Sequence, residues 1–264
     1  MIGSLVKIVL GVAIGAPVFA WLFQERMLFF PRPVESRPAP RPDLEEVTVV
    51  ATDGARLRGW MVKGKETPSP LVIYFGGNAE EVSWIAGLSE RFAGWSLLLL
   101  NFRGYGDSEG KPGEKAFLED ALSIHDYASK RADVDAARIV AMGRSLGSGV
   151  AVHLASHRPL RGVILVSPYD SIVEVAKRHY PYLPVSLLLR HRFDSLALAP
   201  EIEAPLLCLA ATHDRIIPPV HSRALFEAWR GEKTWRELPR SDHDSIAGEP
   251  EYWRSIADFL RMLV

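Results

Sequence analysis

Short, continuous apolar runs alternate with longer stretches of mixed polarity along most of the chain. A run of about five apolar residues is typical of a strand that is buried on both faces of a parallel sheet. The stretches between the runs have the length of helices, and the alternation predicts an α/β fold with a mostly parallel central sheet and helices on both of its faces. The predicted strands are 71–75, 96–100, 138–142, 162–166, 206–210 and 234–238, and the predicted helices are 79–92, 114–131, 146–156, 219–229 and 249–262.

Two segments depart from this alternation. Residues 47–51 and 56–62 flank an Asp-Gly turn, a combination that predicts an antiparallel hairpin. Residues 168–200 are rich in tyrosine, proline and leucine, and we expect them to form a small cap inserted between two strands. The globular domain is therefore predicted to span residues 43–264.

The first 30 residues are strongly apolar. Between residues 5 and 23 the only charged residue is Lys7, and at about 1.5 Å per residue a helix of this length crosses a hydrocarbon core of about 30 Å. We expect residues 1–30 to form a membrane anchor whose last part lies at the interface. The alternative is a secretory signal peptide that is cleaved at residues 18–20. Because arginines follow the apolar stretch, the anchor interpretation favours a cytoplasmic position for the globular domain.

Five prolines are interleaved with arginines over residues 31–42. Proline restricts the backbone to extended conformations, so a segment of this composition behaves as a semi-rigid spacer. We expect a linker that stands the globular domain off the membrane by a few nanometres at most.

The charge balance limits the classes of partner. The 264 residues contain 31 lysines and arginines and 32 aspartates and glutamates, which disfavours nucleic acid as a partner. The single cysteine, Cys208, lies inside a predicted strand. The chain therefore cannot form an intramolecular disulfide, and we expect the thiol to be buried.

Residues 143–147 read Gly-Arg-Ser-Leu-Gly and lie between a predicted strand and a predicted helix. In this context the G-x-S-x-G pattern places its serine on a sharp, strained turn with the hydroxyl exposed, and the glycines leave room for neighbouring backbone. Ser145 is therefore the candidate nucleophile.

A serine hydroxyl is a weak nucleophile at neutral pH and needs a base, which a carboxylate must orient. Asp214 follows the predicted strand 206–210, and His243 follows the last predicted strand. Nucleophile, acid and base thus occur in the chain order that is typical of hydrolases with a strand–turn–helix nucleophile. For Asp214 the alternative is a role as a cap of the next helix. None of the seven other histidines lies beyond the last predicted strand.

Attack on an acyl carbon creates an oxyanion, which backbone N–H groups stabilise. Leu146, directly after the nucleophile, supplies one donor. We assign the second donor to Asn78, in the loop after the predicted strand 71–75, with Gly77 as the alternative. The glycine pair of this loop is not followed by a Gly-Lys-Ser/Thr or G-x-G-x-x-G motif, which disfavours a phosphate-binding loop.

Residues 101–112, N-F-R-G-Y-G-D-S-E-G-K-P, resemble the D-Y-R-G-Y-G-x-S-x-G-x-P signature of the BEM46-like branch of the α/β-hydrolases, and residues 76–79 resemble its H-G-N-A. The likeness covers residues 24–262. Gly76 replaces a histidine of the pattern and Asn101 an aspartate, so the packing beside the oxyanion site is expected to differ. The resemblance implies an α/β-hydrolase fold and a membrane-anchored serine hydrolase without metal or cofactor.

Together these observations predict a serine hydrolase that cleaves ester or thioester bonds of acyl or lipid-like small molecules with the triad Ser145, Asp214 and His243. The apolar anchor and the leucine-rich cap suggest an acyl chain that arrives from a bilayer. A serine peptidase or amidase is the enzymatic alternative, because the same triad cleaves amides. A catalytically inactive, membrane-anchored binding scaffold is the alternative outside enzymes.

Overall fold

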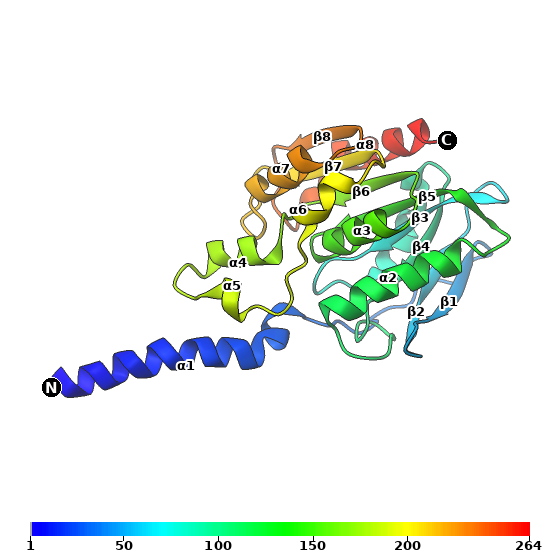
Figure 1. Cartoon of the computed structure of the whole chain (residues 1–264). Coiled ribbons are helices and arrows are strands. Elements are labelled where there is room, and N and C mark those ends of the chain that lie inside the picture. Colours follow the sequence, from blue (N-terminus) through cyan, green and yellow to red (C-terminus); the bar gives the residue numbers. More distant parts are fainter. Residues whose placement is uncertain (1) are drawn as a thin grey trace.

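One sheet of eight strands forms the centre of the molecule in the computed structural model, which describes the backbone of residues 2–264 and the side chains of residues 15–264 (Figure 1). Across the sheet the strands are β1 (Leu44–Val50), β2 (Arg56–Val62), β4 (Ser96–Leu100), β3 (Ser69–Phe75), β5 (Val134–Arg144), β6 (Gly162–Val166), β7 (Leu206–Ala211) and β8 (Lys233–Leu238). The pairs from β4 to β8 are all parallel. The prediction of a mostly parallel sheet is confirmed.

The first two strands form the predicted antiparallel hairpin. At its turn, the N–H of Gly54 donates to the carbonyl of Ala51 at 2.9 Å. The φ angle of Gly54 is 89°, in the left-handed region that favours glycine. The hairpin joins the rest of the sheet through an antiparallel pairing of β2 with β4.

Helices cover both faces of the sheet, as the sequence predicts. Successive side chains of a strand point to opposite faces, so Ile73 of β3 packs in one core and Val72 in the other. The Ile73 core includes side chains of α2 (Glu114–Ala128), α3 (Leu146–His157) and α7 (Pro219–Ala228). The Val72 core includes side chains of the 3₁₀ helix η1 (Val82–Phe92), the short turn η3 (Ile246–Gly248) and α8 (Pro250–Met262).

The helix predicted over residues 79–92 begins later and is a 3₁₀ helix. Ala79 has a φ of 55°, which no right-handed helix contains. Glu81 is extended, and its side chain accepts a hydrogen bond from the N–H of Ser83 at 3.0 Å. The prediction is therefore wrong for residues 79–81 and for the helix type. These residues belong instead to the loop at the carboxyl end of β3.

The carboxyl ends of the parallel strands meet at one edge of the sheet. β3 and β5 are neighbours in its middle, and Phe75, the last residue of β3, pairs with Gly143, one residue before the end of β5. On the other side of β5, Arg144 pairs with Val166 of β6. The loops after β3, β5, β6, β7 and β8 therefore emerge together, which is where open α/β sheets bind ligands.

The predicted cap, residues 168–200, connects β6 to β7. It contains α4 (Ile172–His179), α5 (Val185–Leu188) and α6 (Ser195–Leu198), and it ends in the short 3₁₀ turn η2 (Ala199–Glu201). In Figure 1, α4 and α5 lie at the periphery of the molecule, next to α1 (Ile2–Leu28). The side chain of Gln24 in α1 donates to the carbonyl of Leu188 at 3.1 Å and accepts from the N–H of Arg190 at 2.8 Å, which ties the helix to the cap.

The amino end of α1 points away from the sheet and its carboxyl end lies against the domain (Figure 1). The anchor predicted for residues 1–30 is based on the apolar stretch 5–23, and the side chains of its first part, residues 5–14, lie outside the described part of the chain. Over residues 15–264, no helix combines the length and the apolarity that crossing a membrane requires.

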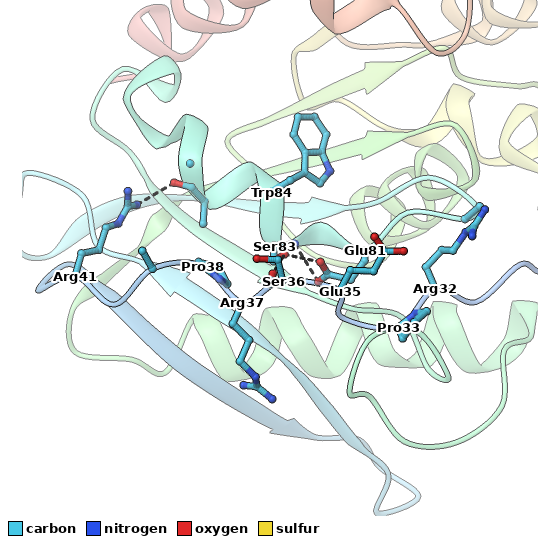
Figure 2. A pocket seen from close by; sticks show the side chains of 14 residues that line it. Arg32, Pro33, Glu35, Ser36, Arg37, Pro38, Arg41, Glu81, Ser83 and Trp84 are labelled. Atoms are coloured by element: carbon cyan, nitrogen blue, oxygen red, sulfur yellow. Dashed lines mark hydrogen bonds between the residues drawn. The ribbon is translucent and has the colours of Figure 1, made fainter.

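The predicted linker, residues 31–42, lies along the domain and is bonded to it. Figure 2 shows this segment beside η1, with a groove of about 680 Å³ between them. The N–H of Gly106 donates to the carbonyl of Arg32 at 2.7 Å, and Arg37 forms an ion pair of 2.5 Å with Asp107. Arg41 donates to the carbonyl of Ala86 at 2.9 Å. The arginines between the prolines thus fix the segment to the domain surface.

Candidate active site

Ser145 stands on a sharp turn between β5 and α3. Its φ and ψ angles are 50° and −117°, a conformation that is strained for a residue with a side chain. A Cβ atom on Gly143 would lie 2.3 Å from the carbonyl oxygen of Gly147, and one on Gly147 would lie 2.2 Å from that of Phe75. The two glycines are therefore required for the close backbone approach that the G-x-S-x-G pattern predicts.

The structure brings Ser145, His243 and Asp214 together. The Nε2 atom of His243 lies 2.9 Å from the Oγ atom of Ser145, and its Nδ1 atom lies 2.7 Å from the Oδ2 atom of Asp214. All three residues are buried. The partners of the imidazole match a neutral ring that donates from Nδ1 to the carboxylate and accepts the serine proton at Nε2.

Asp214 also shapes the turn in which it lies. Its Oδ1 atom accepts hydrogen bonds from the N–H groups of Ile216 and Ile217 at 2.9 and 2.8 Å, while Oδ2 remains for His243. The alternative role as a helix cap does not occur, because α7 begins after Pro218 without a side-chain cap. Three donors around one buried carboxylate hold it in a fixed orientation.

The loop that carries His243 is fixed by its own side chains. The Oδ1 atom of Asp242 accepts hydrogen bonds from the N–H of Asp244 at 3.2 Å and from the N–H and hydroxyl of Ser245 at 3.0 and 2.6 Å. The bonds from Ser245 lower the pKa of the Asp242 carboxyl below its ordinary value. These hydrogen bonds fix the backbone of residues 242–245, from which the His243 side chain extends.

The loop after β3 lies beside Ser145. A Cβ atom on Gly77 would be 3.6 Å from the Cβ atom of Ser145. The N–H of Gly77 already donates to the Oε2 atom of Glu80 at 2.6 Å, whereas the N–H of Asn78 makes no hydrogen bond within the described residues. Leu146 is the first residue of α3, where a backbone N–H has no partner inside the helix.

The side chain of Asn78 bonds this loop to the end of α1 and to Tyr105. It donates to the carbonyl of Leu28 at 2.6 Å, and its Oδ1 atom accepts from the N–H of Phe30 at 3.0 Å and from the hydroxyl of Tyr105 at 2.7 Å. Burial raises the pKa of Tyr105 to about 12, which keeps the phenol a hydrogen-bond donor. Sequence reasoning missed Glu80 and Tyr105, although Tyr105 lies in the R-G-Y-G segment that carries the family resemblance.

The two residues that depart from the family pattern, Asn101 and Gly76, both lie beside Val82 at the start of η1. The Oδ1 atom of Asn101 accepts from the N–H of Val82 at 3.2 Å, and its Nδ2 atom donates to Glu81 at 3.0 Å. A Cβ atom on Gly76 would lie 2.9 Å from a methyl group of Val82. Asn101 thus fixes the start of η1 next to the position where the pattern has a histidine.

The thiol of Cys208 and a metal site are the two other chemical possibilities that the residue types raise. Cys208 is fully buried in β7, as predicted, and desolvation raises the pKa of its thiol far above the ordinary value. Over the part of the chain with described side chains, no three histidine, cysteine, aspartate or glutamate side chains gather in a way that could hold a metal ion. The contacts among Ser145, His243 and Asp214 are of the kind that acid–base and nucleophilic chemistry uses.

An apolar groove of about 110 Å³ lies between α1 and the cap. Its polar side chains are few, and the amide of Gln24 is already bonded to Leu188 and Arg190. The groove is lined by Ala20, Gln24, Met27, Leu28, Ile172, Ala176, Tyr180, Leu183, Val185, Leu188 and Leu189. Leu28, one of the lining residues, also accepts the hydrogen bond from Asn78, whereas Ser145, Asp214 and His243 do not line the groove.

Among solved structures, the fold is similar to an acetyl xylan esterase from Paenibacillus sp. R4, with a TM-score of 0.73 at 20% identity over 87% of both chains. It is also similar to the Pyrococcus furiosus esterase Pf2001, with a TM-score of 0.68 at 19% identity over 88% of this chain and 98% of that one. At such identities the likeness concerns the fold.

Family and sequence comparisons identify relatives of the chain. The family described as serine aminopeptidase, S33, matches residues 66–191. An uncharacterized protein of Mycobacterium tuberculosis is 37% identical over 244 residues, covering 90% of this chain and 87% of the relative. The α/β hydrolase domain-containing protein WAV2 of Arabidopsis thaliana is 27% identical over 95% of this chain and 91% of its own length. An uncharacterized membrane protein of Saccharomyces cerevisiae is 34% identical over 82% and 79%, respectively. With the strand order, the nucleophile turn and these relatives, the chain belongs to the α/β-hydrolase superfamily.

Proposed function

We propose that the chain is a serine hydrolase that cleaves carboxylic ester or thioester bonds of acyl substrates. The observation that carries this proposal is the 2.9 Å contact between His243 Nε2 and Ser145 Oγ, with Asp214 at 2.7 Å on the other ring nitrogen. A hydroxyl on a strained turn, a base in contact with it and a buried carboxylate behind the base are the parts that acyl transfer to serine needs.

In the proposed reaction, Ser145 Oγ attacks the acyl carbon while His243 takes its proton. The imidazolium then protonates the leaving alcohol or thiol, which departs and leaves an ester on Ser145. In the second half of the cycle water attacks the acyl carbon of this ester while His243 takes its proton. The bond between the acyl carbon and Ser145 Oγ then breaks, the carboxylic acid leaves, and His243 returns the proton to Ser145 Oγ. Asp214 keeps Nδ1 protonated and stabilises the charged ring in both halves.

The backbone N–H groups of Leu146 and Asn78 are the proposed oxyanion donors. The N–H of Gly77 is the weaker alternative, because it is 2.6 Å from Glu80 and is not free for a substrate. Removing one such donor typically costs about 3–4 kcal/mol of transition-state stabilisation.

Two observations support an acyl substrate. The solved structures similar in fold include esterases. The groove between α1 and the cap is lined mainly by apolar side chains, as an acyl chain requires.

The segment around Tyr105 and the loop at Asn78, which carry the resemblance to the BEM46-like branch, lie against each other. We therefore place the chain in that branch as part of the proposal.

We further propose that residues 1–30 attach the hydrolase domain, residues 43–264, to a membrane. Large apolar side chains near the carboxyl end of α1 are exposed to solvent, among them Phe19 at 57% and Leu22 at 57%. The similar yeast protein is named a membrane protein. Flotation of the full chain with anionic vesicles tests this: the chain should float, and a variant with Phe19, Leu22 and Phe23 replaced by serine should float less. Equal recovery of both at the bottom of the gradient would contradict it.

A peptidase is the second candidate function. It is favoured by the description of the matching family as serine aminopeptidase. The two candidates share the triad and differ in the leaving group, which is an amine in the peptidase. A catalytically inactive scaffold is the alternative outside enzymes, and the labelling experiment described next distinguishes it from a hydrolase.

Labelling with a fluorophosphonate probe tests the proposal directly. The wild-type chain should form a covalent adduct, and Ser145→Ala should form none. Ser156→Ala, in the helix α3 that follows Ser145, serves as the matched control and should label normally. Hydrolysis of p-nitrophenyl esters should then exceed hydrolysis of aminoacyl p-nitroanilides. Absence of a Ser145-dependent adduct would exclude a serine hydrolase, and a preference for the anilides would favour the peptidase.

A further inference from the structure

Glu80 is a buried carboxylate with four hydrogen-bond donors around it. Its Oε1 atom accepts from the hydroxyl of Tyr74 at 2.7 Å and from Nε1 of Trp84 at 3.0 Å. Its Oε2 atom accepts from the N–H of Gly77 at 2.6 Å and from Nη1 of Arg144 at 3.0 Å. A carboxylate buried to this extent is stable as a charged group only because each oxygen is paired in this way.

Arg144 connects Glu80 to the base. It directly precedes Ser145, and its Nη2 atom donates to the carbonyl of His243 at 3.2 Å while Nη1 holds Glu80. Burial opposes its charge, but the neighbouring Glu80 raises the pKa of Arg144 above the ordinary value. Because the guanidinium is planar and its donors are fixed relative to one another, the two bonds set the distance between their acceptors.

The ion pair therefore joins three segments that are distant in the sequence. Gly77 belongs to the loop after β3, Arg144 is the last residue of β5, and His243 belongs to the loop after β8. A buried ion pair is often no more stabilising than apolar side chains of the same size, so its presence is better explained by geometry than by stability.

We propose that Glu80 and Arg144 are positioning residues of the active site. By occupying the N–H of Gly77, Glu80 turns the loop so that the N–H of Asn78 is the one left for the oxyanion. By bonding to the backbone of His243, Arg144 keeps the imidazole at a fixed distance from the serine beside it. This inference rests on the proposed serine hydrolase function.

The variant Glu80→Gln tests the assignment. A glutamine cannot accept from Gly77 and Arg144 through the same oxygen while accepting from Tyr74 and Trp84 through the other. We expect kcat for p-nitrophenyl acetate to fall about 10- to 100-fold, less than the full loss of an oxyanion donor, with KM changed by less than about twofold. We expect kcat to change more than KM, because the hydrogen bonds of Glu80 position groups that stabilise the transition state.

A double variant separates positioning from folding. Glu80→Gln alone removes the nearer carboxylate partner of the Arg144 guanidinium and leaves only the exposed Asp244 at 3.9 Å, so it should lower Tm. Glu80→Gln with Arg144→Met removes both charges and should recover most of that loss. We expect kcat to stay low in the double variant. If kcat recovers together with Tm, the pair is merely structural and the proposal is wrong.

The control is an ion pair at the opposite end of β5. Arg131 contacts Asp133 at 2.8 Å just before this strand, so Arg131→Met should lower Tm without changing kcat. Wild-type kcat in Glu80→Gln, measured well below its Tm, would overturn the assignment while labelling of wild-type Ser145 still supports the proposed function. Absence of labelling in the wild-type chain would refute both.

Discussion

The side-chain amide of Asn78 donates a hydrogen bond of 2.6 Å to the carbonyl oxygen of Leu28, the last residue of α1. The same side chain accepts from the N–H of Phe30, and between these two residues Phe29 is buried, with its ring centroid 5.5 Å from that of Phe117. The loop that carries the proposed oxyanion donor is thus bonded to the end of the N-terminal helix. A displacement of α1 would reach the active site through this side chain.

Replacing Asn78 by aspartate should weaken this connection. The new carboxylate can still accept from Phe30 and Tyr105, but it faces the carbonyl of Leu28 without a proton to donate, a loss of about 1–3 kcal/mol. We expect kcat for p-nitrophenyl acetate to fall about 3- to 10-fold and trypsin to cleave after Arg26 faster than in the wild-type chain. Tyr105→Phe, which keeps the bond to Leu28, should have a smaller effect on cleavage. Faster cleavage with unchanged kcat would show that the helix and the site are independent.

The variant Asp214→Asn should abolish most of the turnover without unfolding the protein. An amide at this position retains an acceptor for Ile216 and Ile217, but it no longer fixes the proton on Nδ1 of His243 or compensates the charged ring. We expect kcat to fall by about 10³- to 10⁴-fold with little change in KM. Steady-state kinetics and a thermal melt together check this. A loss below tenfold in a folded variant would remove Asp214 from the triad.

Filling the groove between α1 and the cap should change the preference for acyl chain length. Each methylene buried in the groove contributes about 0.8 kcal/mol, so three methylenes correspond to roughly a 50-fold preference. Ala176→Trp, which puts an indole into the groove, should lower kcat/KM for p-nitrophenyl octanoate at least tenfold relative to the acetate. Leu187→Trp is the control, because Leu187 is 85% exposed and does not line the groove. An equal loss on both esters would place the acyl chain elsewhere.

The glycine after Ser145 tests the close packing of the turn. A methyl group on Gly147 would lie 2.2 Å from the carbonyl oxygen of Phe75 and 2.5 Å from that of Gly76, so Gly147→Ala must push two backbone segments apart. We expect a cost of at least about 1–3 kcal/mol, which corresponds to a fall in Tm of roughly 3–10 °C. Gly87→Ala is the matched control, since no atom lies within 4 Å of its Cβ position. Equal melting temperatures of the two variants would contradict the geometry.

Acid should destabilise the fold in part through His153. Burial, followed by the neighbouring His157, lowers the pKa of His153 from its ordinary value of 6.5 to about 4. Between these two values the unfolded chain binds a proton that the folded chain does not, so stability is present above pH 6.5 and is lost as the pH falls toward 4. His153→Gln should therefore show a smaller decrease of Tm between pH 7 and pH 4.5 than the wild-type chain. Parallel curves for the two proteins would show that another group is responsible.

Much of the fold and the approximate position of the site could be predicted from local patterns. Apolar runs mark strands that are buried on both faces, and the pattern around Ser145 requires a strand before it and a helix after it. Asp214 and His243 could be selected because each follows a strand of a parallel sheet, and the carboxyl ends of such strands meet at one edge. The start of η1 could not be predicted, because it depends on the bonds of Asn101 and Glu81 with residues close to them only in space.

The residues that hold the site together were not visible in the sequence. Glu80 and Arg144 are separated by 64 positions, and a charged residue in a loop is usually solvated, so nothing local identifies the pair. The same holds for Asn78 and Leu28, which are 50 positions apart. Such pairings are determined by which strands become neighbours, and a single sequence contains no direct record of that.

The exposed apolar surface of α1 next to the groove has a practical consequence for biochemistry. A detergent with a straight alkyl tail, chosen to keep Phe19 and Leu22 in solution, has the same shape as the acyl chain that the groove is proposed to hold. We expect such detergents to compete with substrate and to raise the apparent KM in proportion to their monomer concentration. Rates measured in lipid nanodiscs or in a rigid steroid detergent should accordingly come closer to those of the enzyme at a bilayer.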